Sequence, residues 1–178
     1  MPAAMAQGRV RWAMTFADSA DHIDRLFRAA YALCGTRADA EDLVEHTFTR
    51  ALEHRRLTRR GDDLAHLIRV LRDTWVDLGL ERSPNQAADG PGADVEWVVD
   101  QSANPGVLAP EVRMAYGALQ RLSPPVREAV VAVDVAGLRY RDAARALRIR
   151  RGTLMTRLSC GRERIATALD GAKCTPMH

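Results

Sequence analysis

The stretch from Gly137 to Arg164, GLRYRDAARALRIRRGTLMTRLSCGRER, constrains the fold more than any other part of this 178-residue chain. Its apolar periodicity predicts two short helices, over about 140–147 and 151–165, joined by a tight turn. Ile149 lies in that turn, where a helix-turn-helix keeps an apolar side chain beneath its bend. The inward-facing residues at helical spacing are Ala143, Ala144 and Leu147 in the first helix and Leu154, Leu158 and Ile165 in the second.

The charge of this stretch indicates a polyanionic partner. Nine arginines lie between positions 139 and 164, against two acidic residues, Asp142 and Glu163. Positive charge is concentrated in the C-terminal part of the whole chain. Residues 1–82 carry 13 basic and 13 acidic side chains, whereas residues 113–178 carry 13 basic and five acidic ones. A basic helix-turn-helix is typical of proteins that place a helix in the major groove of DNA. The alternative is a solvated basic hairpin with no ligand.

The composition predicts an all-α protein. Hydrophobic residues make up 47% of the chain and aromatic residues 5%, and no segment alternates long enough to predict a sheet. The longest apolar run, 129–133, is too short to cross a membrane. The N-terminus lacks the apolar core of a signal peptide, so we expect a cytoplasmic protein. Three cysteines without CxxC spacing argue against a disulfide framework.

Three amphipathic helices predict an N-terminal domain over 18–82. The first carries its apolar face from about position 23 to position 34. Thr36 caps the second, with Asp39 at the third position of a capping box. The third follows a basic connector over 55–60, and its apolar face comprises Leu64, Leu67, Ile68, Leu71, Trp75 and Leu78.

The second of these helices has two distinct faces. Acidic residues lie opposite an apolar stripe, and from periodicity alone the simpler interpretation of the acidic face is exposure to solvent. The apolar stripe comprises Leu43, Val44, Thr47, Phe48, Ala51 and Leu52.

Residues 83–110 interrupt the helical pattern. They are rich in Gly and Pro and contain no Lys or Arg, which predicts a flexible acidic linker. Beyond it, a helix from Glu111 and another that starts at Pro124, capped by Ser123, lead into the helix-turn-helix and complete a domain over 111–170. The predicted fold is therefore all-α, with two small helical domains joined by a flexible acidic linker and a helix-turn-helix in the C-terminal one.

Two segments carry a family resemblance. DAEDLVEHTFTRALEH (39–54) resembles the polymerase-clamp-binding helix of extracytoplasmic-function sigma factors, and 118–165 resembles their promoter −35-reading domain. The resemblance covers both domains in the family's order and spacing. It implies a non-catalytic factor that binds core RNA polymerase and directs promoter-specific transcription initiation. Its implied partners are core RNA polymerase, promoter DNA and an anti-sigma factor, with no membrane and no small-molecule substrate.

The resemblance also implies three sets of site residues. The polymerase-binding face comprises Asp39, Glu41, Asp42 and Glu45. The −10 element is read and opened by Arg59, Arg60, His66, Arg69, Arg72 and Asp73. Two groups of residues are implied at the −35 element. The residues that face its bases are Met155, Thr156, Ser159 and Cys160. The residues that lie at or near its phosphates are Arg150, Arg151, Thr153, Arg157 and Arg162.

The chain departs from the family pattern at five positions, four of which belong to these sets of site residues. His66 replaces a usual Trp, Asp73 a usual Asn, and Arg139 a usual Ser cap, while Met155 and Cys160 stand where the family has basic residues. An arginine that reads guanine contributes about 1–3 kcal/mol of discrimination per base pair. We therefore expect −35 recognition to be weakened or redirected.

Two alternatives belong to the DNA-binding class, and an enzyme is not expected. A stand-alone helix-turn-helix regulator would need a ligand or dimerisation domain, which 18–82 does not indicate; a degenerate sigma-like factor would bind polymerase without selecting promoters. The five histidines form no HExxH motif, and neither a Ser/His/Asp set nor a phosphate-binding glycine loop occurs, so no cofactor or metal is expected. Cys160 on the recognition helix raises a redox-switch hypothesis, against a small residue tolerated beside DNA.

Overall fold

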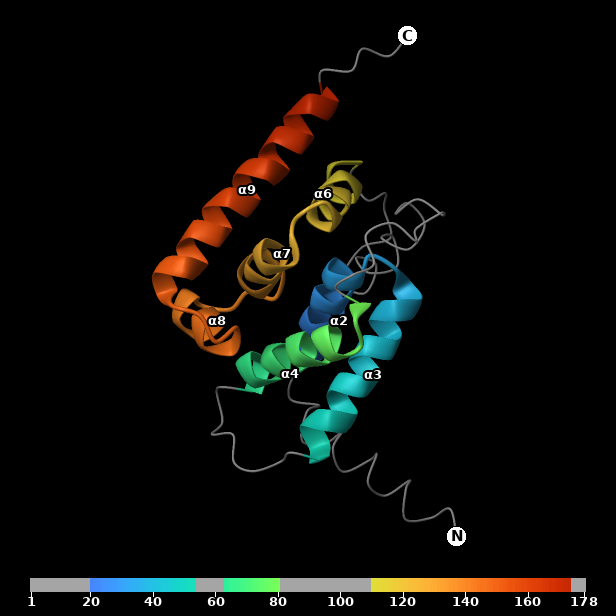
Figure 1. The fold of residues 1–178 in the computed structure, drawn as a ribbon. Helices are drawn as coiled ribbons and strands as arrows, with labels where there is room; N and C mark the ends of the chain where they lie inside the picture. Colours follow the sequence, from blue (N-terminus) through green and yellow to red (C-terminus); the bar gives the residue numbers. More distant parts are fainter. Residues whose placement is uncertain (1–19, 54–62, 81–109, 174–178) are drawn as a thin grey trace.

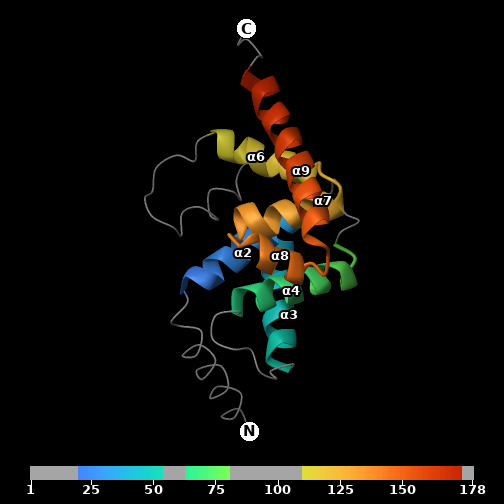
Figure 2. The same cartoon turned by 90° about the vertical axis from the view of Figure 1, so that its left-hand side faces the viewer.

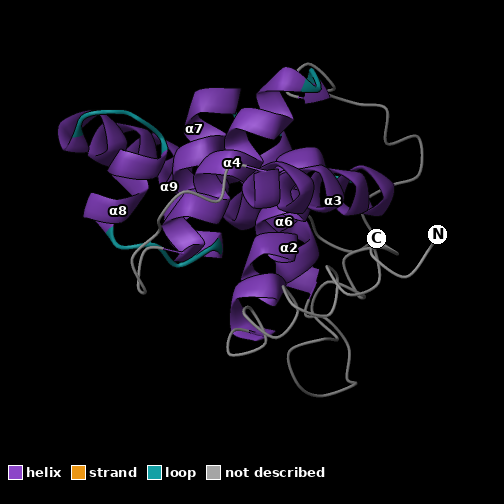
Figure 3. Cartoon of the chain, turned by 90° about the horizontal axis from the view of Figure 1, so that it is seen from below, coloured by secondary structure: helices purple, strands orange, loops and turns teal. Residues whose placement is uncertain are grey.

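The computed structural model describes residues 20–53, 63–80 and 110–173, whose regular structure is entirely helical (Figure 3). The all-α prediction is thereby confirmed. The predicted linker lies outside the described residues, except that Pro110 already begins a helix. The elements (Figure 1) are α2 (Ala20–Cys34), α3 (Arg37–Glu53), α4 (Asp63–Asp77), α6 (Pro110–Gln120), α7 (Pro124–Val130), the π-helix η3 (Val131–Val135), α8 (Tyr140–Ala146) and α9 (Arg151–Lys173).

Helices α2, α3 and α4 form an N-terminal unit. Gly35, with a φ of +87°, ends α2 in a conformation that side chains rarely adopt, and Thr36 then caps α3. The backbone N–H of Asp39 donates to Thr36 Oγ1 at 3.2 Å, and that hydroxyl donates to Asp39 Oδ2 at 2.8 Å. The predicted capping box is confirmed in this form. Arg50 ties α3 to α4 through Asp77 Oδ2 at 2.7 Å.

Helices α6 to α9 form a C-terminal unit in which α9 packs along α6 and α7 (Figures 1 and 2). Leu154 and Leu158 of α9 are fully buried, as the periodicity predicts. Between α9 and α7 the backbones approach closely, because a Cβ atom on Gly161 would lie 2.5 Å from Val130 Cγ2 and 3.1 Å from Val126 Cγ1. Gly161 is therefore the residue that allows this contact.

The two units share one hydrophobic core. Helix α2 packs against α3 and α4 on one side and against α6 and η3 on the other, and α4 packs against α8. As a result, five consecutive residues of α2, Ala29 to Leu33, are all buried. Five consecutive residues span more than one full turn of an α-helix, so both units are needed to bury them. The N-terminal unit is thus built around a helix that the C-terminal unit helps to enclose.

Three sequence-based expectations differ from the structure. Helix α9 continues to Lys173 instead of ending near 165, since residues 166–170 contain Ala and Leu and no helix breaker, and α6 runs alongside. Leu78 and Ile23 were expected on apolar faces but are 44% and 38% exposed. Both lie at the extremity of their helices, Ile23 in the first turn of α2 and Leu78 just after α4.

Within the described residues, no helix combines the length and apolar content that a membrane crossing requires. In the same part of the chain, no three His, Cys, Asp or Glu side chains gather in a way that could hold a metal ion.

Candidate nucleic-acid interface

The outer face of α9 collects most of the residues expected to contact the −35 element. Leu154 and Leu158 anchor the helix in the core, and the positions between them point outward. Met155 is 43% exposed, so this face carries a large apolar side chain. The Thr156 hydroxyl donates to the Gly152 carbonyl at 3.1 Å, so its hydrogen is used within the helix. The exposed members are Arg150, Arg151, Thr153, Met155, Thr156, Ser159 and Arg162, and Arg157 and Cys160 are partly buried.

A tight turn sets the angle between α8 and α9. The Ile149 N–H donates to the Ala144 carbonyl at 3.0 Å, and the Arg148 N–H donates to the Arg145 carbonyl at 3.2 Å. These two bonds form a Schellman motif, in which the residue after the C-cap adopts the left-handed conformation and is usually glycine. Here that residue is Arg148, with a φ of +54°, and it is the only non-glycine with positive φ in the described residues. Ile149 packs against the core, as predicted.

Arg162 is engaged within the protein. Its guanidinium forms a paired contact with Asp134 of η3, at 3.0 Å from Nε and 2.6 Å from Nη2. Hydrogen bonding to that carboxylate raises the pKa of Arg162 above its ordinary value. A DNA phosphate near Arg162 would therefore have to share its guanidinium with Asp134.

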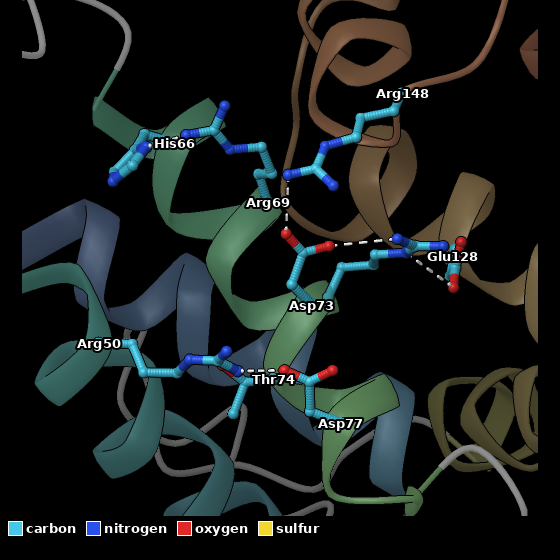
Figure 4. Close-up of polar contacts among 9 residues, drawn as sticks. Arg50, His66, Arg69, Asp73, Thr74, Asp77, Glu128 and Arg148 are labelled. Atoms are coloured by element: carbon cyan, nitrogen blue, oxygen red, sulfur yellow. Dashed lines mark hydrogen bonds and ion pairs between the residues drawn. The ribbon is translucent and has the colours of Figure 1, made fainter. Parts of the chain in front are cut away.

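The polar side of α4 carries four of the residues expected to act on the −10 element (Figure 4). Arg69 Nη2 lies 2.8 Å from His66 Nδ1 near the N-terminal end of α4. Arg72 and Asp73 lie further along the helix and contact each other at 3.2 Å. Arg59 and Arg60, the other two members, lie outside the described residues.

Arg72 and Asp73 are also bonded to the C-terminal unit. Arg72 Nε donates to Glu128 Oε1 of α7 at 3.2 Å, and Arg148 Nη2 donates to Asp73 Oδ2 at 3.2 Å. Burial opposes the charged form of Arg72, but the carboxylates of Glu128 and Asp73 outweigh it and raise the pKa of Arg72. The four residues Arg148, Asp73, Arg72 and Glu128 form one charge chain of alternating sign across the two units (Figure 4).

The acidic face of α3 is directed outward. Glu41, Asp42 and Glu45 are exposed, whereas Asp39 is partly buried in the capping box at the start of the helix. Arg37 Nε lies 2.8 Å from Glu41 Oε1, one turn away on the same helix. Leu43 and Thr47 are buried on the opposite face, as the stripe predicts. The face therefore offers three exposed carboxylates and one that is shared with the helix cap.

Sequence reasoning missed the residues that join the two units. Arg127 of α7 is 4% exposed and donates to four backbone carbonyls, those of Leu33, Leu119, Gln120 and Leu122. Gln120 Nε2 donates to the Ala32 carbonyl at 2.8 Å, and Arg25 Nε donates to the Ala136 carbonyl at 2.8 Å. The only available signal was the arginine at position 127, just before the apolar run 129–133, which by itself indicates no partner.

Comparisons with known proteins bear on both units. A model of Sigma-70 region 2 matches residues 20–81, and a model of Sigma-70, region 4 matches residues 113–165. The ECF RNA polymerase sigma factor EcfG of Rhodopseudomonas palustris is 32% identical over 149 residues, which cover 81% of this chain and 80% of that protein. The chain belongs to the ECF sigma factors. The two units described above are its region 2 and its region 4.

One further relative and one solved structure are also similar to this ECF sigma factor. It is 31% identical over 147 residues to the ECF RNA polymerase sigma factor SigE of Mycolicibacterium smegmatis, a match that covers 81% of this chain and 57% of that protein. The chain thus matches little more than half the length of that relative. The sigma factor RpoE from Bartonella quintana, solved in complex with the anti-sigma factor NepR, superimposes with a TM-score of 0.66 at 22% identity. That match covers 89% of this chain and 98% of the RpoE chain, so the fold is shared across both units.

Proposed function

We propose that this protein binds core RNA polymerase and directs it to specific promoters, without a catalytic step of its own. The observation that carries the proposal is that region 2 and region 4 occur together in family order, each with an outward polar face. The acidic face of α3 is the proposed polymerase contact. The polar side of α4, with Arg59 and Arg60, is the proposed −10 contact, and the outer face of α9 is the proposed −35 contact.

The side chains on the outer face of α9 suit binding to duplex DNA with little discrimination between bases. Arg150, Arg151 and Arg157 supply cations for phosphates, which contribute affinity without sequence information. Met155 replaces a cationic side chain with an exposed apolar one, and apolar side chains in the major groove contact the methyl group of thymine. We expect a −35 preference that depends on thymine more than on guanine.

The chemistry of α4 suits an opened strand. Single-stranded DNA is held by cations along its backbone and by flat side chains on which bases stack. His66 and Arg69 offer a ring and a guanidinium within 2.8 Å of each other, on a helix whose apolar face is fixed in the core. By analogy with the RpoE–NepR complex, we further propose that an anti-sigma factor is a partner of this chain.

Charge reversal on α3 tests the polymerase contact. Asp42→Lys with Glu45→Lys reverses two exposed charges of the proposed face, and Glu163→Lys with Asp170→Lys makes the same charge change on α9. The α3 pair is expected to weaken binding to purified bacterial core polymerase by roughly tenfold or more, about 1.4 kcal/mol, and the α9 pair to leave it within about twofold. Equal binding by both pairs and wild type would contradict the proposed face.

Footprinting separates the remaining alternatives. A stand-alone regulator would protect duplex DNA without polymerase at the concentrations at which it acts, whereas a sigma factor requires polymerase for a full promoter footprint. A degenerate relative would bind polymerase and produce no promoter-specific footprint. The proposed function predicts protection of both promoter elements only in the presence of core polymerase.

A further inference from the structure

One arginine of the proposed −35 face is held in a fixed orientation by the protein itself. Arg162 Nε donates to Asp134 Oδ2 at 3.0 Å, and Arg162 Nη2 donates to Asp134 Oδ1 at 2.6 Å. A paired contact of this kind fixes the plane of the guanidinium as well as its position. It uses the side of the guanidinium formed by Nε and Nη2. Because an arginine has five N–H donors, donors remain for a second anion.

Two local features bring Asp134 and Arg162 together. Asp134 lies in the π-helix η3, where the Ala136 N–H donates to the carbonyl of Val131, five residues back, at 2.8 Å. Single π-helical turns frequently occur at functional sites. Arg162 follows Gly161, whose missing side chain lets α9 lie close against α7, the helix that η3 continues. The pair is thus positioned by close helix packing and by a local departure from α-helical geometry.

The pair lies at the surface, where it contributes little to stability. The Arg162 side chain is 46% exposed and that of Asp134 is 34% exposed. Exposed ion pairs add little to the free energy of unfolding, because water screens the charges and ordering two long side chains costs entropy. An ordered pair at this place therefore matters less for folding than for what its exposed cation can bind.

Arg162 lies along one edge of the outer face of α9. Arg151, Met155 and Arg162 follow one another at i, i+4 and i+11, so they share one side of the helix. Arg162 is about three turns beyond Arg151, roughly 16 Å along the axis. In helix-turn-helix proteins the N-terminal residues of the recognition helix contact base edges, so a residue this far along lies nearer a strand backbone. The group that suits a planar cation there is a phosphate.

We propose that Asp134 is a positioning residue that preorganises Arg162 for one phosphate of the −35 duplex. This inference rests on the proposed function and deepens it. An arginine side chain loses rotamer freedom when it binds a phosphate, and Asp134 already restricts that freedom in the free protein. Since the negative charge of Asp134 by itself repels DNA, any favourable contribution of this residue to binding has to act through Arg162.

Asp134→Asn is the decisive variant. Asn keeps the size of the side chain but loses the charge and one of the two acceptors that the guanidinium uses. Glu163→Gln removes an exposed acid from the next position of α9 and is the matched control for charge. Arg162→Gln removes the cation, and the double variant completes a mutant cycle. Each full-length chain is titrated with a fluorescein-labelled, random-sequence duplex of about 20 base pairs at several salt concentrations from about 50 to 200 mM.

Asp134→Asn is expected to weaken duplex binding by about two- to tenfold, the effect of having to immobilise one long side chain on binding. Weakening is diagnostic, because loss of an acid alone would tighten binding, as is expected for Glu163→Gln. Arg162→Gln should weaken binding at least as much and lower the slope of log K against log [salt] by about 0.9, the value for one phosphate. Adding Asp134→Asn to Arg162→Gln should cause no further weakening.

Binding by Asp134→Asn that equals or exceeds that of wild type would overturn the proposal, and so would the same loss from Asp134→Asn in the Arg162→Gln background. An unchanged salt slope in Arg162→Gln would overturn it as well. Arg151→Gln tests the proposed function separately, because it removes another exposed arginine of the same face. If neither Arg151→Gln nor Arg162→Gln weakens duplex binding, the proposed −35 face itself is wrong.

Discussion

At the scale of single residues, Arg127 joins the two units through hydrogen bonds to four backbone carbonyls. Its guanidinium lies between the C-terminal ends of α2 and α6, where backbone carbonyls lack partners within their own helices and the helix dipole is negative. Burial lowers the pKa of Arg127, but an arginine stays charged in proteins, so the carbonyls hold a full positive charge. The Trp75 ring lies 5.9 Å away and adds a cation–π contact.

Replacement of Arg127 by Met should therefore destabilise the fold. Met fills similar space but removes the donors that the guanidinium supplies to these carbonyls, at a cost of about 1–3 kcal/mol or more. Arg121→Met, at an exposed position of the same unit, is the control and should change stability little. Urea denaturation of the two variants and wild type measures the difference. Equal midpoints for all three proteins would show that the carbonyl contacts are unimportant.

Cys34 is predicted to make stability depend on pH in the alkaline range. Burial, followed by the nearby Asp39 charge, raises the pKa of the Cys34 thiol from 9.0 to about 12, while Arg127 acts in the opposite direction. Above pH 9.0 the unfolded thiol loses its proton while the native thiol keeps it, so the native state binds more protons. The free energy of unfolding should then fall with rising pH, by up to about 1.4 kcal/mol per pH unit from this group.

Cys34→Ala isolates this contribution from other groups that titrate in the same range. The difference in unfolding free energy between wild type and Cys34→Ala should be constant below about pH 8.5 and should shift against wild type as the pH rises toward 11. Chemical denaturation at several pH values gives that difference. A constant difference over the whole range would mean that the native thiol ionises as it does in the unfolded chain.

At the scale of elements, the contact between α7 and α9 depends on the absence of a side chain. A Cβ atom at Gly161 would lie 2.5 Å from Val130 Cγ2, too close for any ordinary contact. Gly161→Ala should destabilise region 4 by about 1–3 kcal/mol through overpacking, in spite of the better helix propensity of Ala. Gly117→Ala in α6 meets nothing within 4 Å and should stabilise by up to about 1 kcal/mol. Thermal unfolding of the two variants should move in opposite directions, and a shift of the same sign would contradict the packing described here.

The existence of the α-helices could be predicted from periodicity, because each described α-helix has a buried apolar face, whereas the π-helical turn η3 was not predicted. The capping box of α3 and the turn around Ile149 could be predicted as well, since both depend on residues close in sequence. Burial of the second face of α2, at Ala29, Ala32 and Leu33, could not be predicted. It requires a partner more than 80 residues away in sequence, and small apolar residues are compatible with either a covered or an exposed face.

At the scale of the whole molecule, the candidate site could be predicted only in part from the sequence. The exposed positions of α9 and α3 follow from helical periodicity once the buried positions are known. The pairing of Asp73 with Arg148 and of Arg72 with Glu128 depends on how region 4 packs on region 2, and no local pattern encodes that arrangement. The same packing explains why a face expected to contact DNA is partly covered in the isolated chain.

Transcription by a reconstituted holoenzyme tests the proposed function of this chain as a promoter-selecting sigma factor. Start sites mapped after overexpression of this protein would supply the templates, and purified core polymerase would be assayed on them with and without the chain in a run-off experiment. We predict initiation at those sites only when the chain is present, with loss of initiation when either promoter element is altered. Initiation that is unchanged by the chain, or that ignores both elements, would contradict it.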